Sequence, residues 1–348
     1  MAGGTGGHVF PALAVAERLV EGGCRVLWLG SRAGMEAQLV PRHGYEMAWV
    51  RFGGVRGKGL MSTLLLPARL LLAFAQAFAI MLRERPAAVI GFGGYISFPG
   101  GMMAVLLGRR LLLHEQNAVA GLANRVLARL ADRVLAAFPD VLPGARWTGN
   151  PVRPEIARIA DPQERYPARR GPLRLLVVGG SLGAQSLNDL LPRALALLPA
   201  ADRPTVVHQS GRGRLDPLRA GYAAAGVAAS VVEFIEDMAA EYAQADLVVC
   251  RAGATTIAEI ACAGVASILV PYPFAVDDHQ TANARFLADA GAALLMPQGA
   301  LDAAKLAAAL ASLDRGACMA MALRARERAR ADAAQAVAQE CISMAERA

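Results

Sequence analysis

Two glycine-rich segments in this 348-residue chain are suited to holding an anion. The first covers residues 2–8, directly after Met1, and the second covers residues 179–184. Each leads into a helical pattern, so each predicts backbone N–H groups at a helix N-terminus, where an anion is favoured. For either segment alone, the alternative is that the glycines only make a tight turn. Two such segments heading two similar halves favour the anion site.

The sequence excludes two common kinds of nucleotide chemistry. The dinucleotide fingerprint G-x-G-x-x-G needs a third glycine for close helix packing, and here Gly4 and Gly6 are followed by Val9 at that position. No G-x-x-x-x-G-K-[ST] segment occurs, which removes P-loop phosphoryl transfer. Because no D-x-D motif is present and the five histidines are scattered, we expect neither a metal nor another cofactor.

The second half carries further residues that suit a nucleoside diphosphate. Ser181 adds a hydroxyl donor within the second glycine segment. Residues 250–259 predict a strand end, a glycine turn and then a helix, with Glu259 about one turn into that helix. The Glu259 carboxylate either accepts from a ribose diol or only complements the positive end of the helix dipole, and the spacing favours neither interpretation.

Two residues of the first half are candidates for a general base. His8 lies in the first glycine segment, and histidine is the side chain that titrates nearest to neutral pH. The alternative is that His8 only caps its helix. Glu115, in the run HEQN at residues 114–117 after a predicted strand, competes for the role of base.

Short apolar runs alternate with helical patterns along the chain, which is typical of a parallel α/β architecture. With 55% hydrophobic and 19% charged residues the chain is globular, and its length suggests about two domains. Residues 151–172 are expected to form a linker, and residues 319–347 a helical tail. The expected strands are residues 25–29, 88–90, 111–114, 134–136, 173–178, 205–208, 231–234, 247–250 and 267–270. The expected helices include residues 11–21, 121–130, 184–198, 255–263 and 281–290.

The first half lacks the strand that should precede its glycine segment. Met1 occupies the last position that such a strand would have. A parallel sheet built without this strand would leave a gap or expose a central ladder. We therefore expect that the natural protein starts upstream of Met1 or that its N-terminal domain is weakened.

The net charge of +7 comes almost entirely from arginine, because only Lys58 and Lys305 are lysines. Arginine carries a permanent charge in a planar fork that suits phosphate. Without a stripe of aromatic and basic residues, this charge indicates an anionic substrate or surface rather than nucleic acid. Five scattered cysteines without a C-x-x-C pair indicate a reducing compartment.

An apolar stretch at residues 60–82 favours contact with a membrane surface. Pro67, Arg69 and Gln76 count against a membrane span, and a core helix is the other alternative. Apolar residues rimmed by cations suit an anionic leaflet. The flanking cations are Arg51, Arg56, Lys58, Arg83 and Arg85.

Five segments, taken together, resemble the MurG family. In chain order they are residues 3–11 (GGTGGHVFP), 114–117 (HEQN), 149–153 (GNPVR), 179–181 (GGS) and 277–284 (DDHQTANA). The resemblance covers nearly the whole chain. It implies the GT-B fold, in which two Rossmann-like domains face each other across a cleft. It also implies inverting transfer of GlcNAc from UDP-GlcNAc to undecaprenyl-diphospho-MurNAc-pentapeptide (lipid I), which forms lipid II for peptidoglycan.

The resemblance further implies roles for particular residues. The transferred sugar and the acceptor diphosphate would lie by Thr5, Gly6, Gly7 and His8, with Asn117 near the GlcNAc. Arg153 would contact the donor nucleotide, Ser181 the donor phosphate, the backbone of Ile235 the uracil, and Gln280 the GlcNAc hydroxyls. Phosphate and ribose would be held by Ala254, Thr255, Thr256, Ile257, Ala258 and Glu259. Among the base candidates we prefer His8 over Glu115.

On this resemblance, residues 1–152 form an N-terminal, acceptor-binding and membrane-facing domain, on which a helix at residues 331–348 packs. Residues 153–330 form the UDP-GlcNAc-binding domain. The enzyme would be peripheral on the cytoplasmic face of the inner membrane, beside other cell-wall and division proteins. The alternatives are another GT-B enzyme that uses UDP-GlcNAc, such as an epimerase or a transferase with a different lipid acceptor, or a non-catalytic nucleotide-sugar-binding subunit.

Overall fold

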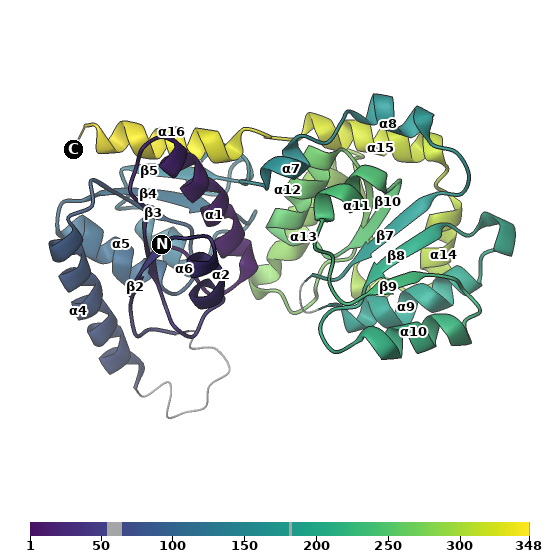
Figure 1. The fold of residues 1–348 in the computed structure, drawn as a ribbon, viewed down its shortest axis with the longest axis horizontal. Helices are drawn as coiled ribbons and strands as arrows, with labels where there is room; N and C mark the ends of the chain where they lie inside the picture. The colour runs from purple at the N-terminus through teal and green to yellow at the C-terminus, as the bar shows by residue number, and fades with distance from the viewer. Residues whose placement is uncertain (54–64, 181–182, 348) are drawn as a thin grey trace. The chain divides into compact units, whose positions relative to one another are not determined.

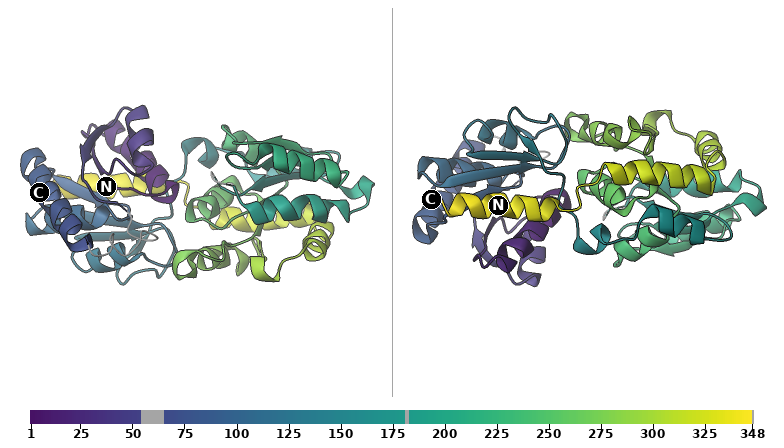
Figure 2. Two further views of the ribbon diagram at one scale, coloured as in Figure 1. Left: turned by 90° about the horizontal axis from the view of Figure 1, so that it is seen from below. Right: turned by 90° about the horizontal axis from the view of Figure 1, so that it is seen from above.

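The computed structural model describes residues 1–53, 65–180 and 183–347. The chain divides into two compact units. The N-terminal unit contains Met1–Val152 and the chain from Arg330 onward, and the C-terminal unit contains Arg153–Ala329. Both units consist of parallel strands connected by helices, as the alternating pattern predicts (Figures 1 and 2).

The N-terminal unit has its parallel strands in two separate sheets. One is the pair β1-β2, and the other has the order β3-β4-β5-β6. The strands are β1 (Leu27–Gly30), β2 (Glu46–Trp49), β3 (Ala88–Gly91), β4 (Arg110–Glu115), β5 (Arg133–Ala136) and β6 (Arg146–Trp147). The helices are α1 (Gly6–Glu21), α2 (Glu36–Arg42), α4 (Leu66–Glu84), α5 (Ser97–Leu106), α6 (Leu122–Leu127) and α16 (Ala333–Ala345).

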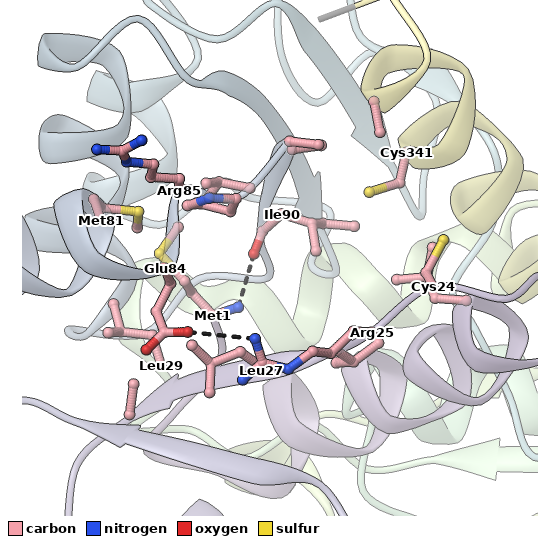
Figure 3. Close-up of a pocket in the computed structure, with 18 of the residues that line it drawn as sticks. Met1, Cys24, Arg25, Leu27, Leu29, Met81, Glu84, Arg85, Ile90 and Cys341 are labelled. Atoms are coloured by element: carbon pink, nitrogen blue, oxygen red, sulfur yellow. Dashed lines mark hydrogen bonds and ion pairs between the residues drawn. The ribbon is translucent and has the colours of Figure 1, made fainter.

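The gap expected beside the first glycine segment is present, because a cavity of about 430 Å³ lies between β1 and β3 (Figure 3). Met1 stands at one end of it. The Met1 amino group donates to the Ile90 carbonyl at 2.8 Å, and the Phe92 amide donates to the Met1 carbonyl at 2.9 Å. Met1 therefore bonds to the edge at β3 as the last residue of a parallel strand would.

The end of the chain forms two helices rather than the single expected helix at residues 319–347. The first, α15 (Arg315–Glu327), buries Cys318, Met321 and Ala322 in the core of the C-terminal unit. The second, α16, packs against α1 and against β3 and β4. The helical pattern breaks because the two apolar faces pack into the cores of different units.

The C-terminal unit is built on one parallel sheet with the strand order β12-β11-β10-β7-β8-β9. The strands are β7 (Arg174–Val178), β8 (Thr205–Gln209), β9 (Ser230–Val232), β10 (Leu247–Cys250), β11 (Ala266–Leu269) and β12 (Leu294–Leu295). The α-helices are α7 (Pro154–Ala157), α8 (Pro162–Ala168), α9 (Gln185–Ala196), α10 (Leu215–Ala224), α11 (Met238–Gln244), α12 (Ala254–Ala263), α13 (His279–Ala288), α14 (Ala303–Ala311) and α15.

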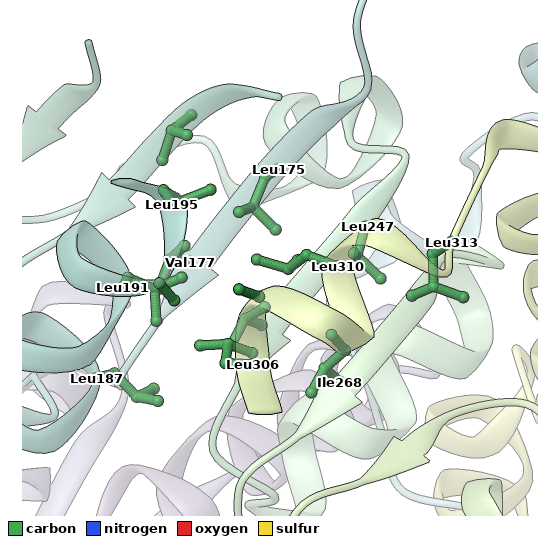
Figure 4. Close-up of a cluster of buried hydrophobic side chains, with 14 of the residues drawn as sticks. Leu175, Val177, Leu187, Leu191, Leu195, Leu247, Ile268, Leu306, Leu310 and Leu313 are labelled. Atoms are coloured by element: carbon green, nitrogen blue, oxygen red, sulfur yellow. The ribbon is translucent and has the colours of Figure 1, made fainter. Parts of the chain in front are cut away.

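Apolar side chains from β7, α9 and α14 form the core on one face of this sheet (Figure 4). Leu175 and Val177 point from β7 toward this core, where Leu191 and Leu306 are also buried. The chain runs outward from β7 to β9 and then returns to β10 on the other side of β7. Ligands of such sheets bind at the carboxyl ends of the strands where this reversal occurs.

The prediction of a linker at residues 151–172 is wrong. The segment contains α7 and α8, and Tyr166 of α8 is 1% exposed. The Tyr166 hydroxyl donates to the Asp246 carbonyl at 2.8 Å, and Arg169 forms an ion pair with the Asp246 carboxylate at 2.6 Å. These long-range contacts fold a segment whose own sequence has little periodicity.

The remaining differences from the expected elements concern short strands and a helix start. The strands β2, β6 and β12 were not expected, and two of them have only two residues. Helix α1 begins at Gly6 rather than at Pro11, because the Thr5 carbonyl already accepts from the amides of His8 and Val9. The helix continues through Pro11, which has no amide proton to donate.

Candidate functional site

The first glycine segment is held in place by Glu36 of α2. The completely buried Glu36 carboxylate accepts from the Gly4 amide at 3.0 Å and from the Ser31 amide at 3.1 Å. The Gly4 amide is therefore not free for a ligand. In the described part of the chain, the amides of Gly6 and Gly7 have no partner. Both are donors at the N-terminus of α1 that an anion can use.

His8, in the first turn of α1, belongs to a chain of hydrogen bonds that ends inside the unit. Its Nδ1 lies 2.8 Å from Oε1 of Gln116, and Nε2 of Gln116 lies 3.0 Å from Nδ1 of His114. His114 in turn contacts the Gly149 carbonyl through its Nε2 at 2.9 Å. Burial lowers the pKa of His114 to about 4, so this imidazole is neutral at physiological pH. The structure thus brings His8 and Gln116 together, and no pattern in the sequence assigned Gln116 a role of its own.

Glu115 is a buried residue that organises the loop after β4. Its Oε1 accepts from the Asn117 amide at 2.9 Å and from Nδ2 of Asn117 at 3.4 Å. Its Oε2 accepts from the Gly121 amide at 3.1 Å and from Nδ2 of Asn124 at 2.9 Å. Both oxygens already have two donors, and the residue is 2% exposed. This geometry favours a positioning role for Glu115.

Two loops at the carboxyl ends of β7 and β10 lie on neighbouring strands of the C-terminal unit. In the first loop only glycine fits at position 183, because a Cβ there would lie 2.1 Å from the Ser210 carbonyl and φ is +71°. Ser181, predicted to hold phosphate, lies outside the described residues. The second loop leads through Gly253 into α12.

The N-terminus of α12 presents the predicted run of residues 254–259. Within the described ranges, the amides of Ala254, Thr255 and Thr256 have no partner, and Oγ1 of Thr255 is buried without one. Ile257 is different, because its amide donates to the Gly253 carbonyl at 3.0 Å and its side chain is completely buried. Neither group of Ile257 is left for a ligand. The first-turn amides are therefore the donors that an anion can use.

Arg153 and Glu259, both predicted to bind the donor, contact each other. Nη2 of Arg153 donates to Oε1 of Glu259 at 3.0 Å, and the Tyr242 hydroxyl donates to Oε2 at 3.3 Å. Burial raises the pKa of Glu259, and the nearby Arg153 opposes this shift. A ribose hydroxyl would join a carboxylate that is already oriented by these two donors.

Two further predicted contacts use groups that are partly occupied. The Ile235 amide donates to Oε1 of Gln209 at 3.0 Å. The Ile235 carbonyl is therefore the backbone group left for the uracil ring. Oε1 of Gln280, in the first turn of α13, accepts from the Tyr272 amide at 2.9 Å, which leaves its NH2 group as the donor.

Arg251, directly after β10, was given no role from the sequence. Its guanidinium donates to the carbonyls of Val270 and Pro271, each at 3.1 Å, and to Ser186 and Gln298. All of these partners are neutral, so in the described part of the unit this half-buried cation has no carboxylate against it. Its position between a predicted strand and a glycine turn could have identified Arg251 as a candidate site residue.

The described residues contain no group of three or more His, Cys, Asp or Glu that could hold a metal ion. The titratable groups of the site are instead engaged in the hydrogen bonds above.

Comparison with known proteins places these features in a family. The family profile of the glycosyltransferase family 28 N-terminal domain matches residues 1–136, and that of the C-terminal domain matches residues 174–339. A relative from Ralstonia nicotianae is 62% identical over 348 residues, covering 99% of this chain and 95% of the relative. It is described as a UDP-N-acetylglucosamine--N-acetylmuramyl-(pentapeptide) pyrophosphoryl-undecaprenol N-acetylglucosamine transferase. A relative from Cupriavidus metallidurans with the same description is 60% identical, covering 99% of this chain and 97% of its own.

Solved structures agree with the sequence comparison. The crystal structure of MurG from Acinetobacter baumannii matches with a TM-score of 0.87 at 42% identity, covering 99% of this chain and 98% of that one. The calicheamicin glycosyltransferase CalG4 matches with a TM-score of 0.68 at 17% identity, over 99% and 97% of the two chains, and shares the fold alone. The chain therefore has the two-domain GT-B fold and belongs to the MurG family of glycosyltransferases, within glycosyltransferase family 28.

Proposed function

We propose that this protein transfers GlcNAc from UDP-GlcNAc to lipid I and so forms lipid II, with inversion at the sugar carbon. The observation that carries the proposal is the 62% identity to a relative described as the transferase of this reaction, over nearly the whole length of both chains. The arrangement of groups in each unit supports it.

The N-terminal unit supplies the acceptor half of the site in this proposal. Inversion by a single displacement needs a base that takes the proton of the attacking hydroxyl. His8 fills this role, and the free amides of Gly6 and Gly7 face the diphosphate of the acceptor. Glu115 positions Asn117, which contacts the GlcNAc.

The C-terminal unit stabilises the leaving UDP in this proposal. Negative charge develops on the diphosphate as the bond to the sugar breaks. The free amides at the start of α12 and the loop that includes Ser181 donate to these oxygens, and one such preorganised donor contributes about 3–4 kcal/mol in other enzymes. Arg153, Glu259, the Ile235 carbonyl and Gln280 hold the nucleotide and the sugar. No metal is assigned to this step.

Helix α4 provides the surface for a lipid-linked acceptor. By length and composition α4 is apolar enough to cross a membrane. However, it buries Ala73, Ala77 and Met81 in the N-terminal unit and packs on α5, so one face is already covered by protein. The opposite face exposes Leu71, which is 68% exposed, and other large apolar residues. These others are Leu65, Leu72, Phe78 and Leu82, which lie on or directly before α4.

We therefore assign the protein to the cytoplasmic face of the inner membrane, where α4 lies in the interface as a peripheral anchor. Arg83 and Arg85 lie at the C-terminal end of α4 and suit an anionic leaflet. Arg56 and Lys58, which the sequence placed in the same basic rim, lie outside the described residues. Neighbouring cell-wall and division proteins remain candidates for partners at this membrane.

Placing charge on the exposed face of α4 is expected to weaken membrane binding. The double variant Leu71→Glu/Leu82→Glu should reduce binding to anionic vesicles about tenfold or more, because it removes two apolar side chains and adds two like charges against the leaflet. Flotation with anionic and neutral vesicles measures the effect. The matched control is Leu197→Glu, a comparably exposed leucine of the C-terminal unit. Equal flotation of both variants would contradict the proposal that α4 binds the membrane surface.

The function is tested by incubating the protein with labelled UDP-GlcNAc and a short-chain lipid I analogue. The expected product is a β-linked disaccharide on the lipid, with release of UDP and an unchanged rate in the presence of a chelator. Conversion of UDP-GlcNAc without an acceptor would indicate an epimerase instead. Binding of UDP-GlcNAc without turnover of either kind would indicate a non-catalytic subunit.

A further inference from the structure

The hydrogen-bond chain from His8 to Gly149 has a direction, which follows from the atoms at its inner end. The Gly149 carbonyl only accepts, so Nε2 of His114 must carry a proton. Only glycine fits at position 149, since φ is +82° and a Cβ there would lie 2.3 Å from Cβ of Arg330. His114 is completely buried and neutral, so its Nδ1 has no proton and accepts.

The side-chain amide of Gln116 is oriented by its contacts with His114. Its Nε2 donates to Nδ1 of His114 at 3.0 Å and also to the His114 carbonyl at 2.8 Å. Both contacts need a donor, so together they fix which end of the amide is nitrogen. The oxygen of Gln116 therefore faces His8 and can only accept. Since it lies 2.8 Å from Nδ1 of His8, that nitrogen must carry a proton.

We propose that Gln116, held by His114, is a positioning residue that fixes His8 in the Nδ1-protonated tautomer and so keeps the basic lone pair on Nε2. This inference rests on the proposed function only for its catalytic consequence, because the tautomer is a property of the free protein. An imidazole in water favours the opposite tautomer, with the proton on Nε2, and in that form His8 would present a proton to the acceptor hydroxyl instead of a lone pair. Gln116 and His114 are both completely buried, so water does not compete for the bond between them.

The tautomer can be measured without activity. Nitrogen-15 spectra of histidine-labelled protein at about pH 8, where an ordinary imidazole is neutral, distinguish a protonated Nδ1 from a protonated Nε2. We expect His8 to have its proton on Nδ1, whereas the exposed His43 has it on Nε2. A proton on Nε2 of His8 in the unaltered protein would overturn the proposal, and this measurement needs no variant.

Two variants of Gln116 test the residue itself. Gln116→Met removes the acceptor at similar size, so His8 should revert to the Nε2-protonated form and kcat should fall about tenfold or more with little change in the KM for UDP-GlcNAc. Gln116→Glu keeps an oxygen toward His8 and, when its other oxygen is protonated, still donates to Nδ1 of His114, so this variant should retain the Nδ1-protonated form. The spectrum of His208, which contacts the Tyr222 hydroxyl in the other unit, serves as an unaffected internal reference. An Nδ1-protonated His8 in Gln116→Met would also overturn the proposal.

These outcomes separate the two hypotheses. If His8 has the expected tautomer and loses it in Gln116→Met while kcat is unchanged, Gln116 positions His8 but His8 is not the base. If His8 in the unaltered protein carries its proton on Nε2 while His8 variants lose activity, His8 remains the proposed base. The proposed role of Gln116 is then contradicted.

Discussion

His8→Gln lowers kcat by about two to four orders of magnitude, the usual contribution of a positioned general base, and leaves the KM for UDP-GlcNAc nearly unchanged. Glutamine places an amide nitrogen near the position of Nε2 but has no lone pair there that takes a proton. In the proposed function the nucleotide of the donor is held by groups of the C-terminal unit, so the binding of UDP-GlcNAc should depend little on this change. Steady-state kinetics with a soluble lipid I analogue and UDP-GlcNAc measure both parameters.

Glu115→Gln is the comparison that decides between the two candidate bases. The carboxylate of Glu115 accepts from four donors, and an amide can accept from only some of them, so the loop at residues 117–121 should loosen. We expect a lower melting temperature and a loss in kcat smaller than that of His8→Gln. Abolished turnover in Glu115→Gln, with kcat of His8→Gln within a few-fold of the unaltered protein, would make Glu115 the base.

Acidification from pH 7 to pH 4 lowers the free energy of unfolding of the C-terminal unit by about 3 kcal/mol through His208 alone. His208 is completely buried, and burial lowers its pKa from 6.5 to about 3. Between these values the unfolded chain binds a proton that the folded unit does not, so stability is present above about pH 6.5 and is lost as the pH falls toward 3. Each pH unit in this window corresponds to about 1.4 kcal/mol.

The same argument applies to the N-terminal unit through His114, whose pKa is about 4. The two units can be followed separately, because all three tryptophans, Trp28, Trp49 and Trp147, lie in the N-terminal unit. Urea unfolding at both pH values is therefore measured by tryptophan fluorescence for one unit and by far-ultraviolet circular dichroism for the whole chain.

His208→Gln should remove most of the acid sensitivity of the C-terminal unit, because glutamine does not titrate. His43→Gln, at an exposed position, is the matched control and should change nothing. If the unfolding free energy of His208→Gln falls with pH as steeply as that of the unaltered protein, His208 is not the group that titrates.

Much of the fold could be predicted from the sequence, because short apolar runs and glycine turns are local signals. The strands β3, β4, β5, β7, β8 and β10 lie within two residues of their expected bounds. The short strands β6 and β12 were not predicted, because two residues are too few to show an alternating hydrophobic pattern. Each forms by pairing with the edge of a neighbouring strand, β5 for β6 and β11 for β12. The break between α15 and α16 was also missed, since either helix could continue by propensity alone.

For the site, the sequence determined which residue types are present and at which ends of the strands they stand. It identified His8, Glu115, Arg153 and Glu259 as candidates and favoured His8 over Glu115 as the base without deciding between them, and it could not pair Arg153 with Glu259. Only the tertiary structure decided that Glu115 is saturated by the loop after it, and that Gln116 connects His8 to His114 across 108 and 2 positions of the sequence. The physical reason is that a hydrogen bond depends on which atoms meet within about 3 Å, and residues far apart in the chain meet only when the core has packed.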